Sequence, residues 1–165
     1  MRQLPGDTIA IRFSEMKDVR ELIMLDNEIW DETTTPGPLA WRSREDYLLH
    51  SPPGSQLVAI SRDEVCGYVG FACPSGMESN RHVYEMHIAV HPDWQRQGVG
   101  YRPTDALAAL ARSRGIRKLR ARVLSSNEGA LSFYSRTGFR EEGRLKEEYR
   151  LQDRYIDEVF MAKVL

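Results

Sequence analysis

The sequence predicts a mixed α/β (α+β) fold, in which a central sheet of about seven strands is flanked by about four helices. Two observations support this fold class. Strand-like segments come first, an alanine- and leucine-rich segment with helical periodicity follows the central strand, and strand-like segments then return. The chain has 165 residues, of which 41% are hydrophobic and 28% charged, and these values are typical of a globular domain. We therefore expect residues 1–165 to form a single domain.

Capping residues, prolines and glycines delimit the expected elements. We expect strands at residues 8–13, 56–61, 65–73, 83–90, 118–124, 139–149 and 154–165. We expect helices at about residues 15–30, 44–49, 104–114 and 128–136. Ser14 and Ser43 are the candidate N-caps of the first two helices, and Gly115 and Gly138 are the candidate C-terminal stops of the last two.

The most informative pattern lies in residues 82–114. A strand rich in β-branched and apolar residues ends at His91-Pro92, and a helix follows Gly98 and Gly100. The glycines let the backbone turn sharply and approach a ligand, and the unpaired amides at the start of the helix can bind a phosphate or pyrophosphate. The third glycine of a dinucleotide fingerprint and the Gly-Lys-Ser/Thr of a P-loop are both missing. The glycines alone are therefore equally compatible with a tight strand-to-helix connection.

Two motifs together are more specific than the glycines. The strand ends in Ile88-Ala89-Val90-His91-Pro92-Asp93, and Gln-x-x-Gly-x-Gly and an alanine-rich helix come next. Downstream lie Asn-Glu-Gly-Ala-Leu-Ser-Phe-Tyr at residues 127–134 and Thr-Gly-Phe at residues 137–139. This arrangement resembles the GCN5-related N-acetyltransferase (GNAT) family over essentially the whole chain. The resemblance implies a mixed, mostly antiparallel sheet and acetyl-CoA as the cofactor.

The resemblance also implies an activity. An acetyl group would move from acetyl-CoA to a primary amine by direct attack in a ternary complex. The acceptor would be a small metabolite, an amino acid, a polyamine or a protein amino group. The alternative is a non-catalytic member of the family that binds CoA or an acyl-CoA as a sensor or interaction module.

Cofactor residues follow from the same resemblance. The pantetheine arm would run along Ile88, Ala89 and Val90, and Asn127 would cap the later helix and contact the cofactor. The pyrophosphate would be held by the segment Gln95, Arg96, Gln97, Gly98, Val99, Gly100, Tyr101 and Arg102. Pro103 departs from the aliphatic residue usual in the family. It would cost about 3 kcal/mol if the helix began at Val99 and little if the helix begins nearer Tyr101.

Acetyl transfer requires a base for the amine proton, a donor for the oxyanion and an acid for the thiolate. Tyr134 lies where the family commonly has the tyrosine that protonates the thiolate, and its other interpretation is packing against the sheet. Glu85 and His87 share one face of the central strand and are the candidate bases. Glu85 could instead pair with an arginine of a neighbouring strand, and ordered water could replace a side-chain base.

The acceptor is expected to bind between the first two helices and near the loop before the last strand. Trp30 and Glu28 are candidate acceptor-binding residues, together with Glu85. His87 and His91 are four residues apart, a spacing that suits metal ligands on a helix but not on a strand, so we expect no metal site.

Charge and cysteine content limit the expected partners and location. The net charge of −1 gives no general attraction to nucleic acid or to anionic membranes, so we expect neither as a partner. Cys66 and Cys73 have an odd spacing on one expected strand, so they would face opposite sides and stay unbridged. We expect a cytoplasmic enzyme without a signal peptide or membrane span. A homodimer is compatible with the sequence but is not predicted by it.

Overall fold

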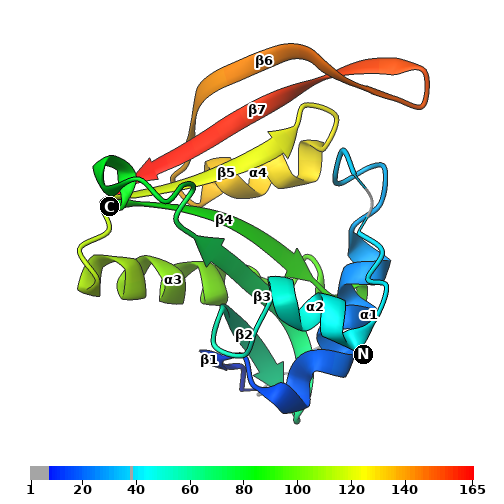
Figure 1. Cartoon of the computed structure of the whole chain (residues 1–165), viewed down its shortest axis with the longest axis vertical. Coiled ribbons are helices and arrows are strands. Elements are labelled where there is room, and N and C mark those ends of the chain that lie inside the picture. Colours follow the sequence, from blue (N-terminus) through cyan, green and yellow to red (C-terminus); the bar gives the residue numbers. More distant parts are fainter. Residues whose placement is uncertain (1–7, 38) are drawn as a thin grey trace.

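The computed structural model describes residues 8–37 and 39–165. These residues form a seven-stranded sheet with the order β1-β2-β3-β4-β5-β7-β6 (Figure 1). The strands are β1 (Ala10–Phe13), β2 (Gln56–Ser61), β3 (Glu64–Ala72), β4 (Val83–Val90), β5 (Lys118–Leu124), β6 (Arg140–Leu151) and β7 (Arg154–Val164). Only β4 and β5 pair in parallel, and the other neighbours are antiparallel. The predicted mixed, mostly antiparallel sheet is confirmed.

Four α-helices cover the two faces of the sheet (Figure 1). They are α1 (Val19–Ile29), α2 (Arg44–His50), α3 (Tyr101–Ser113) and α4 (Glu128–Arg136), and three short 3₁₀ helices lie at η1 (Met16–Asp18), η2 (Glu78–Asn80) and η3 (Pro92–Trp94). Leu107 of α3 and Tyr134 of α4 share one core cluster with Met86 of β4. Residues of α1 and α2 share another cluster with Ala89 of β4. Successive β4 side chains therefore serve opposite faces, as alternation requires.

Most boundaries agree with the sequence, and the start of α1 does not. The bounds of β2, β4, β5 and α4 are those predicted. Ser14 is not the N-cap of α1, because its buried hydroxyl accepts a hydrogen bond from the Gly54 amide at 3.1 Å. Glu15 and Asp18 instead form a capping box around η1, so the segment begins as a 3₁₀ turn. Ser43 does cap α2, where it accepts from the Asp46 amide at 3.0 Å.

The start of α3 explains how Pro103 is tolerated. The helix begins at Tyr101, with Gly100 as its N-cap, and therefore extends three residues upstream of the predicted start at Thr104. Pro103 occupies the third position of the helix, where an amide has no partner within the helix. The helix ends before Gly115, which has a φ of +76° as expected for a C-terminal glycine.

The sheet opens between β4 and β5. Their parallel pairing covers only three positions, which join Val83 to Lys118, Tyr84 to Leu119, and Glu85 to Arg120. Beyond them the two strands diverge, and Figure 1 shows β4 and β5 spreading apart towards the α1 side. The antiparallel neighbour β3 still pairs with β4 as far as Val90. The last residues of β4 are therefore supported on one edge only.

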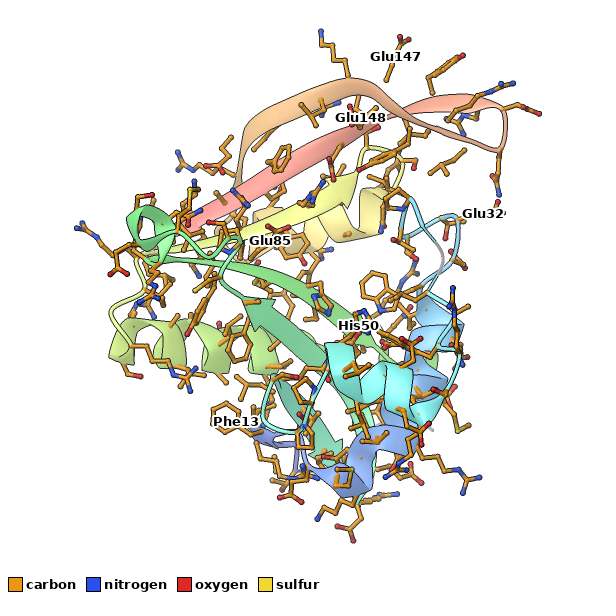
Figure 2. The ribbon with its side chains drawn as sticks, viewed as in Figure 1. Phe13, Glu32, His50, Glu85, Glu147 and Glu148 are labelled. Carbon is orange, nitrogen blue, oxygen red and sulfur yellow. The ribbon has the colours of Figure 1, made fainter. Side chains whose placement is uncertain are left out.

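The β6–β7 hairpin reaches over the wide end of this opening. Its tip turns at Gln152 and Asp153, whose φ values of 50° and 59° are typical of a two-residue hairpin turn. The side-chain amide of Gln152 donates to Glu32, in the segment after α1, at 3.1 Å. Figure 2 shows Glu32 beside the tip of the hairpin. The hairpin and the segment after α1 therefore meet across the end of the opening.

Other sequence expectations concern cysteines, membranes and metals. Cys66 is buried, Cys73 is exposed and both are free thiols. In the described part of the chain, no helix is long and apolar enough to span a membrane. Within residues 8–37 and 39–165, no group of three or more His, Cys, Asp or Glu side chains is placed to hold a metal ion.

Candidate active site

A cleft of about 1270 Å³ occupies the opening between β4 and β5. It is lined by the end of β4, the segment leading into α3, the end of β5 and one face of α4, with further walls from the segment after α1 and from the hairpin. The lining includes Trp30, Thr34, Leu39, His87, Ile88, Ala89, Val90, Gln95, Arg96, Gly98, Val99, Gly100, Tyr101, Arg122, Asn127, Tyr134, Tyr149 and Glu158.

The open edge of β4 presents backbone groups to the cleft. The His91 amide donates to the Cys66 carbonyl of β3 at 2.8 Å, so odd-numbered residues of β4 direct their backbone groups towards β3. Ile88 and Val90 then direct theirs towards the cleft, where β5 no longer pairs. The Val90 carbonyl does accept from the Gln95 side chain at 3.0 Å, which confirms this direction. An extended ligand with amide groups can bind this edge as an added strand.

The segment before α3 supplies the anion site. Gly98 has a φ of +76° and Arg96 a φ of 60°, so the chain turns twice in left-handed conformations before the helix begins. The first amides of the thirteen-residue helix α3 then have no partner within the helix. A Cβ added to Gly100 would lie 3.1 Å from Cε2 of Phe133, so a larger residue has little room there.

Two residues predicted for this anion site point elsewhere. Arg102 donates to the Ile9 carbonyl at 3.2 Å, and Gln97 donates to the Asp93 carbonyl at 3.0 Å. Neither belongs to the cleft lining, whereas Gln95, Arg96 and Tyr101 do. For Arg102 the reason is the start of the helix at Tyr101, which places it at the second helical position, directed away from the cleft; Gln97 lies before the helix and is held by its bond to Asp93.

Helix α4 brings Asn127 and Tyr134 to the cleft. Asn127 caps the helix, accepting from the Ala130 amide at 3.2 Å, as predicted. The Tyr134 ring contacts those of Phe133 and Phe139 edge-on, with ring centroids 5.5 and 5.1 Å apart. Burial raises the pKa of the Tyr134 phenol above its usual value, so the hydroxyl stays protonated and can act as a donor. Its position suits protonation of a thiolate in the cleft.

Glu85 lies outside the cleft lining, at the end where β4 and β5 are still paired (Figure 2). Its carboxylate is 2.8 Å from a guanidinium nitrogen of Arg120 and 3.9 Å from Nε of Arg122. Arg120 is its register partner on β5. The geometry is that of the alternative interpretation, an ion pair with an arginine of the neighbouring strand.

His87 lies two residues further along the same face and does line the cleft. Its ring contacts Trp30 and Tyr68 edge-on, with centroids 5.9 and 5.6 Å apart, and it packs over Gly70. Desolvation by these neighbours lowers the pKa of His87, although the charges of Asp26 and Glu85 oppose the shift. The ring is therefore a neutral imidazole at neutral pH and can accept a proton.

The wide end of the cleft contains residues that the sequence analysis missed. Arg122 donates to both oxygens of Glu158 at 2.7 and 3.0 Å, and Tyr149 lies in the same wall. These three come from β5, β6 and β7, and only the pairing of the hairpin with β5 brings them together. Trp30 lines the cleft as predicted. Glu28 does not, because it lies 3.8 Å from His91, outside the lining.

Comparison with known proteins assigns the chain to a family. The acetyltransferase (GNAT) family model matches residues 17–139, and the chain belongs to this family. L-methionine sulfoximine/L-methionine sulfone acetyltransferase of Pseudomonas aeruginosa is 26% identical over 165 residues, which cover 92% of each chain. L-amino acid N-acyltransferase MnaT of Escherichia coli is also 26% identical and covers 93% of this chain and 92% of its own.

Solved structures show the same fold. The structure of smu.2055 from Streptococcus mutans has a TM-score of 0.87 at 26% identity, covering 94% of this chain and 98% of that one. A GNAT phosphinothricin acetyltransferase from Sinorhizobium meliloti, in complex with acetyl-CoA, has a TM-score of 0.83 at 21% identity. The match covers 96% of this chain and 89% of that one. The chain is an acetyl-CoA-dependent N-acetyltransferase. The alternative of a non-catalytic binding module is set aside, because the named relatives are enzymes.

Proposed function

We propose that the acceptor is a small primary amine of the amino-acid type, that His87 takes its proton and that Tyr134 protonates the leaving thiolate. One observation carries the choice of a small acceptor. The contact between Glu32 and Gln152 joins the segment after α1 to the tip of the hairpin, and this segment and the hairpin also contribute residues to the cleft lining. A folded protein terminus needs a more open approach than a free amino acid.

The proposed reaction uses both ends of the cleft. The pantetheine arm bonds to the open edge of β4 at Ile88 and Val90, and the pyrophosphate lies at the start of α3. The amine nitrogen attacks the thioester carbon, while a backbone amide of β4 donates to the oxyanion. The attack gives a tetrahedral intermediate, and its collapse breaks the carbon–sulfur bond. The amine proton passes to His87, and the thiolate receives its proton from Tyr134.

Glu85 has a structural role in this proposal. Its carboxylate lies between Arg120 and Arg122 and is absent from the cleft lining. The proton acceptor is therefore assigned to His87, the other residue predicted on this face of β4.

Arg122 supports an acceptor that carries a carboxylate. Its bonds to Glu158 use Nε and Nη2, while a guanidinium has five N–H groups in total. The two N–H groups on Nη1 can donate to the carboxylate of an amino acid. Trp30, Leu39 and Tyr149 provide an apolar wall for its side chain. The two relatives described above, each of which matches nearly the whole chain, are named for amino acids or amino-acid analogues.

A panel of matched amines tests the acceptor. Free thiol release from acetyl-CoA would be followed with L-methionine, with the same amine lacking its carboxylate, with a diamine, and with a peptide beginning in alanine. Product mass would confirm each transfer. We expect the amino acid to be the best substrate and its decarboxylated analogue to lose at least about tenfold in kcat/KM. Preference for the peptide or the diamine would refute the proposed acceptor.

We also propose a reducing, cytoplasmic setting, which the two free thiols support. The absence of nucleic-acid and membrane partners stays a prediction. Whether the protein forms a homodimer requires a measurement of its mass in solution.

A further inference from the structure

A buried carboxylate behind the cleft has a role that the proposed reaction has not yet used. Asp26 of α1 is only 2% exposed. Its Oδ1 accepts from Nε1 of Trp30 at 3.1 Å and from the hydroxyl of Tyr68. Its Oδ2 accepts from Nε1 of Trp41 at 2.9 Å. Every one of these donors is neutral.

This arrangement suits a charged carboxylate. An indole N–H can only donate, so both oxygens of Asp26 must accept. With the Tyr68 hydroxyl as a donor, all three hydrogen bonds run towards the carboxylate. Neutral donors satisfy the hydrogen-bonding capacity of a carboxylate but leave its negative charge uncompensated. Burying an unpaired charge of this kind costs stability.

The donors to Asp26 are also the neighbours of His87. Trp30 and Tyr68, which Asp26 holds, are the two rings that contact the imidazole edge-on. The Trp30 indole also donates to the Tyr68 hydroxyl at 3.0 Å, so the three groups form one network. The side chain of Asp26 therefore fixes the two rings between which His87 lies.

The charged groups around His87 single out Asp26. On its own strand the charge that acts on His87 is Glu85, which Arg120 and Arg122 neutralise. The neighbouring strand β3 contributes the neutral Tyr68 and Gly70. From α1 and its C-terminal cap come Asp26, whose charge also acts on His87, and Trp30, which is neutral. Asp26 is thus the source of uncompensated negative charge for the imidazole.

We propose that Asp26 is a positioning residue for His87, which orients the imidazole through Trp30 and Tyr68 and stabilises the imidazolium formed in the reaction. The inference rests on the proposed role of His87 as the base. Removing the charge should make the imidazolium less stable and the base weaker. The acidic limb of the kcat–pH profile, where His87 becomes protonated, should then move to lower pH.

The matched test uses a Trp41→Phe background. In the single variant Asp26→Asn, the new amide N–H₂ would face the Trp41 indole N–H, and two donors would oppose each other. Trp41→Phe removes that donor and leaves Trp30 and Tyr68 in place. The double variant Trp41→Phe/Asp26→Asn then differs from Trp41→Phe by the loss of the charge and by an amide N–H₂ in place of Oδ2, with no opposing indole donor. Profiles of kcat would be measured with saturating acetyl-CoA and amine.

We expect the double variant to show its acidic limb about one pH unit lower than Trp41→Phe, with a plateau about three- to tenfold lower. Titration of the assigned His87 ring by NMR should shift in the same direction without any turnover. A lower melting temperature with an unmoved limb and an unmoved His87 titration would overturn the inference, because a purely structural role predicts that result.

The variant His87→Ala separates this inference from the proposed function. If His87→Ala abolishes the limb while Trp41→Phe/Asp26→Asn keeps the limb of Trp41→Phe, His87 is the base and only the role of Asp26 is refuted. If the limb persists in His87→Ala, the assignment of His87 fails, and the role of Asp26 fails with it.

Discussion

Gly70 gives the sharpest mutational test of His87. The two residues are register partners on β3 and β4. A Cβ added to Gly70 would lie 2.3 Å from Cε1, 2.5 Å from Nε2 and 3.1 Å from Nδ1 of the imidazole. Carbon contacts normally lie at about 3.5 Å, so Gly70→Ala must move the ring by about 1 Å. The fold can survive, because the obstructing atoms belong to a side chain, and we expect a loss of about 1–3 kcal/mol in stability.

Activity should suffer more than stability. A displacement of about 1 Å in a catalytic group can cost about 10²-fold in rate. We therefore expect kcat of Gly70→Ala to fall by about 10²-fold, while the affinity for acetyl-CoA in a calorimetric titration stays within about twofold. Gly143→Ala on β6 is the control, since a Cβ there would meet nothing within 4 Å. A folded Gly70→Ala enzyme with normal kcat would refute the placement of the base at His87.

The remaining predictions address other parts of the site. Gly100→Val should weaken acetyl-CoA binding by at least about tenfold in a calorimetric titration, because a Cβ there would already lie 3.1 Å from Phe133. Equal affinity in a folded variant would refute the assignment of the anion site to the start of α3. Tyr134→Phe should keep that affinity but lower kcat by about 10²–10⁴-fold in the thiol-release assay, and an unchanged rate would assign the proton to water. Glu85→Gln should lower the melting temperature and leave the shape of the pH profile unchanged, whereas a lost acidic limb would restore Glu85 as the base. In the wild-type enzyme, the lowered pKa of His87 should place the acidic limb of kcat below the usual histidine value of 6.5, and a limb above that value would contradict the desolvation of the ring by its neighbours.

Local patterns predicted most of the scaffold. Alternation along β4 correctly separated Met86 from His87, and the glycines after it correctly marked a strand-to-helix connection. The same pattern could not choose between Glu85 and His87, because both share one face. The choice depends on where β5 leaves β4, and that point is set by the parallel register between distant segments.

The acceptor end was less predictable for the same physical reason. Arg122 and Glu158 meet only because β7 returns to pair with β5, a contact between segments far apart in the sequence. Asp26 was visible as a polar residue on the mostly apolar face of the first helix. Nothing local could identify its donors, which come from the C-terminal cap of α1, the segment before α2, and β3.

The central claim is that acetyl-CoA and a small amine react in the cleft between β4 and β5, with His87 as the base. Its most direct test is thiol release at saturating acetyl-CoA and amino acid, measured across pH for the wild-type enzyme and His87→Ala, with the product identified by mass. We predict acetylated amine in step with released thiol, and an acidic limb that disappears in His87→Ala together with most of the rate. An identical profile in both enzymes would contradict the account.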